Sequence, residues 1–158
     1  MSEWVQAWRL VKASRAATAF DGEGAYRFGG RWNSRGVRAV YASSTLALAL
    51  LEILVHIDPA ARVPELVAIP IQIPAAMIER WPHTRLKRLE GSFARPIGDT
   101  RRDGNDWIRA ARNPALLVPS AIIPIEQNYL LNPEHPDFPK LEIGPAKPFP
   151  FDLRLLNA

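Results

Sequence analysis

The sequence predicts an α+β fold, with a mixed β-sheet core, one buried central helix and several short helices. Short runs rich in β-branched and aromatic residues recur along the chain, as expected of strands. One run, residues 46–56, is instead rich in Leu and Ala and long enough for a helix. Strands and helices do not alternate regularly, which argues against a doubly wound sheet. The length of 158 residues predicts a single domain, residues 1–158.

The first half of the chain supplies two predicted strands and a loop between them. Apolar and polar side chains alternate in WRLVK (residues 8–12), which predicts the first strand. Residues 13–26 are small and polar, with two acidic-glycine pairs, and indicate a loop with room for one helical turn. The stretch GGRWNSRG (residues 29–36) follows as a glycine-rich turn. The β-branched and aromatic run VRAVYA (residues 37–42) predicts the next strand.

Residues 46–56 (LALALLEILVH) form the clearest helix of the sequence. The hydroxyl residues at 43–45 are candidate N-caps. Because the run is apolar on nearly every face, we expect a helix that is buried on most sides. Asp58 ends it, since a residue that precedes proline disfavours the helical region.

The second half of the chain combines short elements with many of the 15 prolines. Apolar or alternating runs predict strands at residues 66–73, 115–118, 121–125, 127–131 and 149–155. Short helices are predicted at residues 74–81 and, after a turn at 103–104, at residues 106–112. Pro70 within the first of these strands indicates a sheet edge or a bulge.

The composition excludes several classes of protein. Without cysteine the chain has neither disulfides nor thiolate zinc sites, and we expect a cytoplasmic protein. The longest apolar run, residues 46–55, is far short of the ~20 residues that a membrane span needs. A net charge of +4 favours anionic partners: nucleic acid, phosphorylated metabolites or an acidic protein. His56, His83 and His135 lack ligand spacing, so no metal site is expected.

Glu52 interrupts the apolar run of the predicted helix. Glutamate is rarely fully buried unless it is paired. In one interpretation Glu52 lies on a solvated stripe of the helix, with His56 at the helix end four residues on. In the other it lines a cleft, where a carboxylate stabilises a developing positive charge or binds a ribose hydroxyl. The residue pattern leaves both interpretations open.

Arg31 lies within the glycine stretch. Glycines let a backbone approach a ligand closely, and a guanidinium binds phosphate in a bidentate manner. The alternative is an ordinary glycine turn with a solvated arginine and Trp32 packed in the core. The stretch is neither a GxGxxG nor a P-loop pattern. Arg35 is expected to be solvated.

Tyr41 and Ser120 are the remaining candidates from residue type and position. Tyr41 closes a predicted strand just before the helix, so it either stacks on an aromatic ring such as nicotinamide in a cleft or packs in the core. Ser120 lacks the GxSxG elbow, which argues against a serine hydrolase and favours a hydrogen-bonding or turn role.

An ordered set of motifs resembles the RES-domain family. The motifs are GGRWN (29–33), VYAS (40–43), ALLE (49–52), VPSA (118–121) and NYLLNPEH (128–135). The resemblance spans nearly the whole chain and rests on the order and separation of the motifs. It implies a fold similar to that of ADP-ribosyltransferase toxins such as diphtheria toxin.

The resemblance also implies roles for individual residues. Arg31, Glu52 and Ser120 match the arginine, glutamate and serine of the family. The other matching positions are Tyr41 for the strand tyrosine, Arg9 for a second arginine on the first strand, and Asn128. The implied chemistry is cleavage of the nicotinamide–ribose bond through an oxocarbenium-like transition state, with Glu52 stabilising the sugar cation. Arg31 and Arg9 would neutralise the pyrophosphate, Tyr41 would stack on nicotinamide, and Ser120 would hydrogen-bond the substrate.

The implied function is that of a toxin in a bacterial type II toxin–antitoxin pair, which consumes NAD⁺ by hydrolysis, phosphorolysis or transfer of ADP-ribose to a protein. NAD⁺ is then a substrate, and no separate cofactor is expected. The implied partners are an Xre-type antitoxin and a second copy of the chain, as a homodimer within the toxin–antitoxin complex. DNA is contacted only through the antitoxin, and no membrane is involved. A basic nucleic-acid-binding module is the alternative of a different class, but the sequence lacks helix-turn-helix, zinc-finger and RNP1 patterns.

Overall fold

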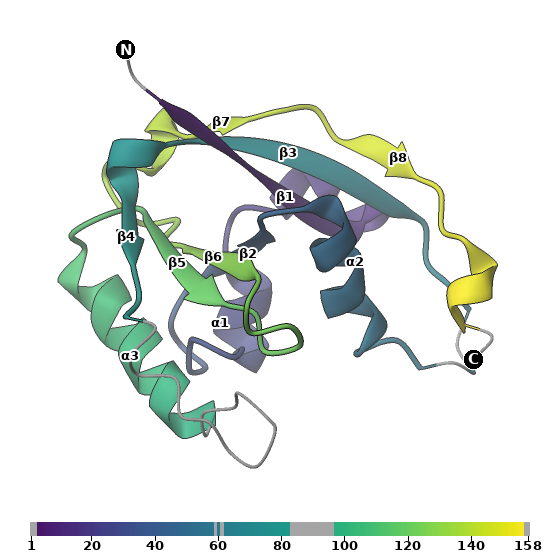
Figure 1. Ribbon diagram of the computed structural model, residues 1–158, viewed down its shortest axis with the longest axis horizontal. Coiled ribbons are helices and arrows are strands. Elements are labelled where there is room, and N and C mark those ends of the chain that lie inside the picture. Colours follow the sequence, from purple (N-terminus) through teal and green to yellow (C-terminus); the bar gives the residue numbers. More distant parts are fainter. Residues whose placement is uncertain (1–2, 59, 61, 83–96, 157–158) are drawn as a thin grey trace.

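A computed structural model describes residues 3–58, 60, 62–82 and 97–156 of the chain and confirms the α+β class. Its strands form a curled eight-stranded sheet in the order β4-β5-β6-β2-β1-β3-β7, with β8 paired to β3 (Figure 1). The strands are β1 (Trp4–Lys12), β2 (Val40–Ser43), β3 (Leu66–Pro74), β4 (Ile78–Arg80), β5 (Ala115–Pro119), β6 (Gln127–Leu131), β7 (Glu142–Ile143) and β8 (Lys147–Phe149). The α-helices are α1 (Glu23–Phe28), α2 (Leu46–Leu54) and α3 (Ile97–Ala110). Short 3₁₀ helices are η1 (Ala13–Thr18), η2 (Ala75–Met77), η4 (Phe138–Lys140) and η5 (Leu153–Leu156).

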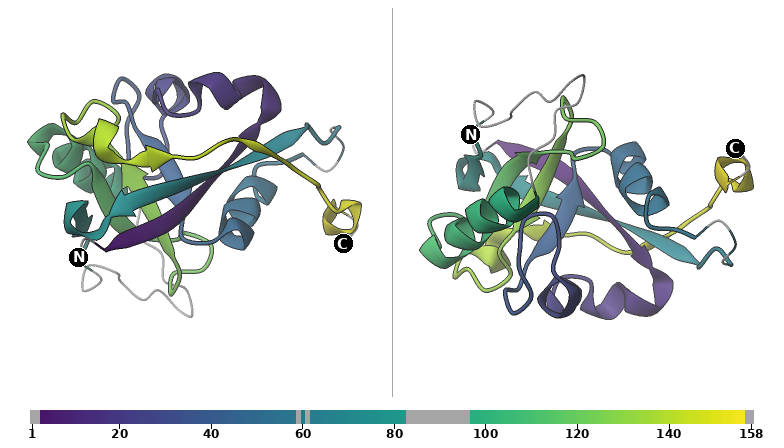
Figure 2. Two further views of the ribbon diagram at one scale, coloured as in Figure 1. Left: turned by 90° about the horizontal axis from the view of Figure 1, so that it is seen from above. Right: turned by 90° about the horizontal axis from the view of Figure 1, so that it is seen from below.

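The sheet divides into two halves where β1 meets β2. β1 pairs with β3 along its whole length, and β2 pairs with β6 through all of its residues. Between β1 and β2 the register has one matched pair, Trp8 with Ser43. The two halves therefore run at different angles, with β1 and β3 crossing over β2, β5 and β6 (Figures 1 and 2). This junction lies beside α2, the helix that carries Glu52.

Side chains alternate between the two faces of the sheet, and each face has its own core. On one face Leu116 and Leu130 pack with Trp32 and Trp107, which brings α3 against β5 and β6. On the same face, α2 packs over β1 and β3 through the buried side chains Leu10, Ala49, Leu66 and Ala68. Small and aliphatic residues fill the opposite face beneath Phe20 and Phe138.

The helix α2 begins as predicted but is less buried than predicted. Thr45 caps it, since its Oγ1 accepts a hydrogen bond from the Leu48 amide at 3.1 Å. Leu48 and Ala49 are buried, but Leu51 is 36% exposed and Val55 59% exposed. The prediction of a helix buried on most sides was therefore wrong. The sheet covers one stripe of the helix, and apolar composition alone does not reveal what covers the other faces.

Two predicted loop and helix segments differ from the structure. Residues 13–26 are more helical than predicted, because they contain η1 and most of α1. Residues 74–81 form not one short helix but the turn η2 followed by β4, which runs parallel to β5. The Trp81 amide extends this pairing by donating to the Leu117 carbonyl at 2.9 Å. Pairing at the sheet edge thus overrides the local helix propensity.

Two predicted strands are replaced by turns. In residues 121–125 the amides of Ile122 and Ile123 both donate to Ser120 Oγ at 3.1 Å, so a side chain takes the place of a neighbouring strand. In residues 149–155 only the first residue belongs to a strand, β8, and η5 follows. Asp152 Oδ1 accepts the Arg154 amide at 3.0 Å and turns the chain there.

The remaining corrections concern a glycine and a proline. Residues 103–104 lie inside α3 rather than in a turn, because Gly104 packs against the loop before β2. A Cβ at Gly104 would lie 1.7 Å from the Trp32 carbonyl oxygen. Pro70 lies in an interior strand where pairing passes from β8 to β7, and its carbonyl accepts the Gly144 amide at 2.8 Å. None of the helices in the described ranges is both long and apolar enough to cross a membrane.

Candidate active site

Glu52, Ser120 and Asn128 come together from α2, the end of β5 and β6. Ser120 Oγ donates to Glu52 Oε1 at 2.8 Å, and Asn128 Nδ2 donates to the same oxygen at 2.7 Å. Glu52 is half-buried, and its second oxygen, Oε2, has no hydrogen bond or ion pair with a described residue. The carboxylate is therefore fixed through Oε1, and Oε2 is left without a partner among the described residues. This geometry differs from a solvated stripe, because Glu52 is half-buried and bonded to the sheet, and a cleft lined by Glu52 stays a prediction.

The Ser120 hydroxyl is fully used within the protein. Ser120 is 2% exposed, and its single proton is donated to Glu52. Its lone pairs accept the amides of Ile122 and Ile123. Ser120 thus orients the carboxylate, and a hydrogen bond from Ser120 to substrate stays a prediction.

Asn128 lies opposite Ser43 in the β2–β6 register, so both side chains lie on the face of the sheet that α2 covers. Its Nδ2 holds Glu52, while its Oδ1 is buried and accepts no hydrogen bond from the described residues. A buried acceptor without a donor is costly, so this amide oxygen lowers the stability of the fold unless another group reaches it.

Tyr41 holds the glycine-rich stretch of residues 29–36, here called the glycine loop, through its hydroxyl. The Trp32 amide donates to Tyr41 Oη at 2.9 Å, and Tyr41 Oη donates to Asn33 Oδ1 at 2.6 Å. Burial raises the pKa of Tyr41 well above its usual value, although the Trp32 amide and the Arg101 charge oppose the rise. The phenol therefore stays protonated, and only its ring is left for contact with a ligand.

Protein packing requires a glycine at position 30 of the loop. A Cβ at Gly30 would lie 2.6 Å from Tyr41 Oη, so this glycine admits the tyrosine. Asn33 is 0% exposed, and its Nδ2 donates to the Ala25 and Val37 carbonyls at 2.9 Å. These bonds fix the loop from within. Arg31, half-buried between Gly30 and Trp32, is therefore carried on a rigid backbone.

Helix α3 fixes the same loop from outside. Thr100 Oγ1 donates to the Arg31 carbonyl at 2.6 Å, and Arg101 Nε donates to the Gly30 carbonyl at 2.8 Å. Asn105 Nδ2 donates to Ser34 Oγ at 2.8 Å. None of these α3 residues was predicted from the sequence as part of the site. The only signal was the adjacent pair of arginines at 101 and 102, which carries no motif.

Arg9 lies apart from the other predicted site residues. It alternates with Trp8 and Leu10, which pack toward α2, so its side chain leaves the opposite face of the sheet. Its Nε donates to the Ala19 carbonyl at 2.7 Å and its Nη1 to the Tyr41 carbonyl at 2.8 Å. Burial lowers the pKa of Arg9 to about 10, although Asp21 opposes the change. Arg9 thus bridges β1 to β2 at the junction, and its contact with pyrophosphate stays a prediction.

The remaining residues that the sequence singled out lie either in the core or at the surface, apart from one outside the described ranges. Trp32 is 3% exposed and packs edge-on against Trp81 at 5.1 Å, which confirms it as a core anchor. His56 and Arg35 are exposed. His83 lies outside the described residues. Within the described ranges, no cluster of three or more His, Cys, Asp or Glu residues could hold a metal ion.

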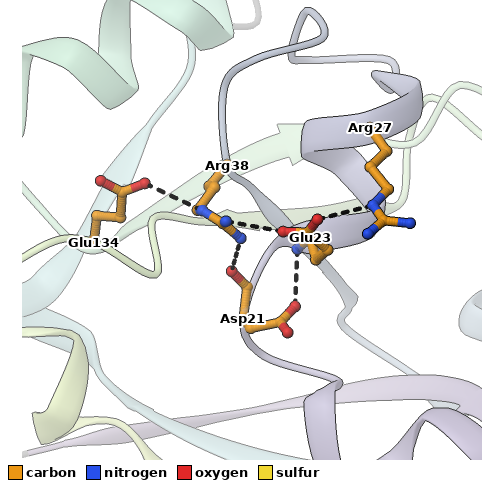
Figure 3. A network of polar contacts seen from close by, with 5 residues as sticks. All are labelled: Asp21, Glu23, Arg27, Arg38 and Glu134. Atoms are coloured by element: carbon orange, nitrogen blue, oxygen red, sulfur yellow. Dashed lines mark hydrogen bonds and ion pairs between the residues drawn. The ribbon is translucent and has the colours of Figure 1, made fainter.

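A surface network braces α1 just before the glycine loop (Figure 3). Glu23 pairs with Arg27 and Arg38, both at 2.8 Å. Arg38 also donates to the Asp21 carbonyl at 3.1 Å and lies 3.8 Å from Glu134. These arginines are neutralised by carboxylates, so they are unsuited to binding an anionic ligand.

A groove of ≈ 490 Å³ lies elsewhere, between η1 and β7, and Glu52 is not among its lining residues. Small residues such as Ala16 and Ala17 line it, together with Asp21. A carboxylate there would repel a pyrophosphate. We therefore place the candidate site at Glu52 and the glycine loop.

The two parts of the candidate site share one face of the sheet. Tyr41 and Ser43 lie two residues apart on β2, so their side chains leave the same face about 7 Å apart. Tyr41 contacts the loop that carries Arg31, and Ser43 lies beside Asn128, which holds Glu52. Glu52 and the glycine loop that carries Arg31 thus lie over the same face of the sheet, linked through β2 and β6.

Such a curled, mixed α+β sheet, with a fixed glutamate and an arginine loop on one face, is consistent with an ADP-ribosyltransferase-like fold. The chain belongs to the RES domain family, which it matches over residues 6–152.

Similar proteins match along nearly their whole length. One, from Photorhabdus laumondii, is named Toxin Res; it is 34% identical over 155 residues, which cover 96% of this chain and 97% of the relative. Another Toxin Res, from Yersinia enterocolitica, is 35% identical and covers 94% of this chain and 97% of its own length. A protein from Sphingobium named Prs ADP-ribosylating toxin is 35% identical, with 95% of this chain and 96% of the relative covered.

Proposed function

We propose that this chain is a bacterial toxin that degrades NAD⁺ by cleaving the bond between nicotinamide and ribose. One observation carries the proposal. Glu52 is held through Oε1 by two neutral donors and forms no ion pair with a described residue, so its charge is available to a substrate. Membership of the RES domain family and the names of the relatives support the toxin role.

The proposed chemistry uses the free oxygen of Glu52. The electron pair of the C1′–N bond leaves with nicotinamide, which departs as a neutral molecule and needs no general acid. The positive charge that develops on the ribose is stabilised by the nearby carboxylate. Water or phosphate then adds to C1′ and loses a proton to solvent. Asn128 would contribute to substrate binding by holding Glu52 Oε1 through its Nδ2, because its own Oδ1 is buried.

The rest of the site would bind the two ends of the substrate. We assign Arg31 to the pyrophosphate, because its loop is fixed by Tyr41 and by α3. The Tyr41 hydroxyl is occupied, so its ring would stack at the nicotinamide end. Arg9 would act at longer range, because two carbonyls already hold its guanidinium. NAD⁺ is the substrate in this proposal, and no further cofactor takes part.

Incubation of the purified protein with NAD⁺ tests the proposal, with release of nicotinamide as the measurement. The assay is run with and without inorganic phosphate, because either water or phosphate could be the acceptor. We expect loss of NAD⁺ in at least one condition. Stable NAD⁺ in both conditions would show that the chain does not act on NAD⁺ without a protein acceptor.

A second candidate is transfer of ADP-ribose to a protein by the same residues. The Sphingobium relative, which is named Prs ADP-ribosylating toxin, favours it. Labelled NAD⁺ in a cell lysate separates the two activities. A discrete labelled protein band supports transfer, whereas free ADP-ribose without such a band supports hydrolysis.

The proposal includes an Xre-type antitoxin and a homodimer as partners. Co-expression with the product of the neighbouring gene should then restore growth to cells that this chain arrests. Light scattering of the purified complex should give a mass with two copies of the chain. A neighbouring product without a helix-turn-helix, or a complex with one copy, would contradict these assignments.

A further inference from the structure

Arg101 differs from Arg9, Arg27 and Arg38 in what it contacts. Arg27 and Arg38 pair with carboxylates at the surface, and Arg9 gives two of its nitrogens to carbonyls. Arg101 is half-buried on α3, and its Nε donates to the Gly30 carbonyl at 2.8 Å. Its Nη1 and Nη2 have no hydrogen bond or ion pair with any residue that the structure describes.

The Nε contact fixes the guanidinium over the glycine loop. A side chain at Gly29 would place its Cβ 3.5 Å from Arg101 Nη2, so the terminal nitrogens lie directly beside this glycine. Gly29 has a φ of 71°, in the left-handed region that favours glycine. The loop backbone therefore keeps this position free of side-chain atoms.

The charge of Arg101 acts on Tyr41, whose hydroxyl holds the glycine loop. It opposes the burial that raises the pKa of the Tyr41 phenol. A half-buried cation without a counter-ion pays a desolvation cost, which an incoming anion offsets. A guanidinium with two unused nitrogens on one edge matches two phosphate oxygens.

We propose that Arg101 is a second phosphate-binding residue, which contacts the pyrophosphate of the substrate from α3 while Arg31 contacts it from the glycine loop. This rests on the proposed action on a dinucleotide. The Gly30 carbonyl orients the guanidinium, and Nη1 and Nη2 donate to the phosphate oxygens.

Binding of ADP and of adenosine to the purified protein, measured by calorimetry, tests the proposal without turnover. The variants are Arg101→Gln and Arg101→Lys, and Arg109→Gln is the matched control, because Arg109 is exposed on the same helix. We expect Arg101→Gln to weaken ADP binding about tenfold while adenosine binding stays unchanged. Arg101→Lys should be intermediate, because an ammonium keeps the charge but not the fork. Arg109→Gln should bind both ligands as the unmodified protein does.

Equal ADP affinity in Arg101→Gln and Arg109→Gln would overturn the proposal, and so would a lack of ADP binding by the unmodified protein. A purely structural role predicts a different pattern: a lower melting temperature and equal loss of ADP and adenosine binding. Where NAD⁺ is turned over, Arg101→Gln should raise KM about tenfold and change kcat less than threefold. ADP binding that depends on Arg101 in a protein that leaves NAD⁺ intact would refute the proposed reaction but retain this phosphate contact.

Discussion

Glu52 and Glu79 are both partly buried glutamates, but their carboxylates have different kinds of hydrogen-bond donor. Glu79 on β4 accepts Arg112 Nη2 at 2.7 Å and Trp107 Nε1 at 3.0 Å, so a cation neutralises it. Glu52 accepts only the neutral donors Ser120 and Asn128 from the described residues. A neutralised carboxylate joins elements of the fold, whereas a fixed and unneutralised one retains its attraction for a cation.

The largest effect should follow from neutral substitution of Glu52, with the same substitution of Glu79 as its control. Glu52→Gln keeps the shape of the side chain but removes the charge that would stabilise the sugar cation. We expect NAD⁺ turnover to fall at least about 100-fold, with the circular dichroism spectrum and melting temperature retained. Glu79→Gln is the matched control and should keep its activity within about threefold. Comparable losses in both variants would show that the contrast between these carboxylates has no catalytic meaning.

A smaller loss of activity is expected when the orientation of Glu52 is loosened. Ser120→Ala removes one of the two donors to Oε1 and leaves the Ile122 and Ile123 amides without their acceptor. Turnover should fall roughly tenfold, and the free energy of unfolding should fall by about 1–3 kcal/mol.

Ser44→Ala is the control for this substitution, because its hydroxyl makes no hydrogen bond with the described residues. Steady-state kinetics and denaturant unfolding of both variants give the comparison. If Ser120→Ala loses stability but keeps full turnover, Ser120 serves only the turn that follows β5.

The next effect concerns stability more than rate, because Tyr41 uses neutral hydrogen bonds to hold the loop that carries Arg31. Tyr41→Phe leaves the Trp32 amide and Asn33 Oδ1 without their partner. We expect a loss of about 1–3 kcal/mol, which corresponds to a fall of several degrees in Tm.

Tyr26→Phe is the matched control, since Tyr26 is 42% exposed and should lose almost nothing. Thermal unfolding of both variants measures the difference. Equal Tm values for the two variants would mean that the Tyr41 hydroxyl does not brace the loop.

The sequence predicted the kinds of residue in the site better than their contacts. Glu52 stood out because a carboxylate in an apolar helix is rare, and this reasoning needs no knowledge of the fold. Its partners Ser120 and Asn128 lie far along the chain, and their residue types alone did not show that they would hold its Oε1. That contact depends on how β5 and β6 pair and on where α2 crosses them.

The failures of prediction share a physical cause. Residues 78–80 look helical by composition but form β4, because the edge of β5 offers backbone partners. Gly104 looks like a turn residue but lies in α3, because Trp32 packs against it. Arg101 carries no motif, and only the approach of α3 to the Gly30 carbonyl gives it a role. Contacts between distant segments decide each case.

The smallest expected effect is a pH dependence of the free energy of unfolding, which arises from the ion pair of Glu79 with Arg112. Burial raises the pKa of Glu79, but the hydrogen bonds from Arg112, Asn113 and Trp107 and the charge of Arg112 together lower it by more. The net pKa therefore lies below the usual value. A lowered folded-state pKa stabilises the protein above the unfolded value, ~4.3, and this contribution disappears as the pH falls through the folded value. The Arg112 side chain is 57% exposed, so solvent screening limits the contribution to less than about 1 kcal/mol. Urea unfolding at pH 7 should therefore show Glu79→Gln slightly less stable than the unmodified protein, and the difference should shrink below pH 4. A difference that stays constant down to the lowest pH would show that the ion pair with Arg112 does not shift the titration of Glu79.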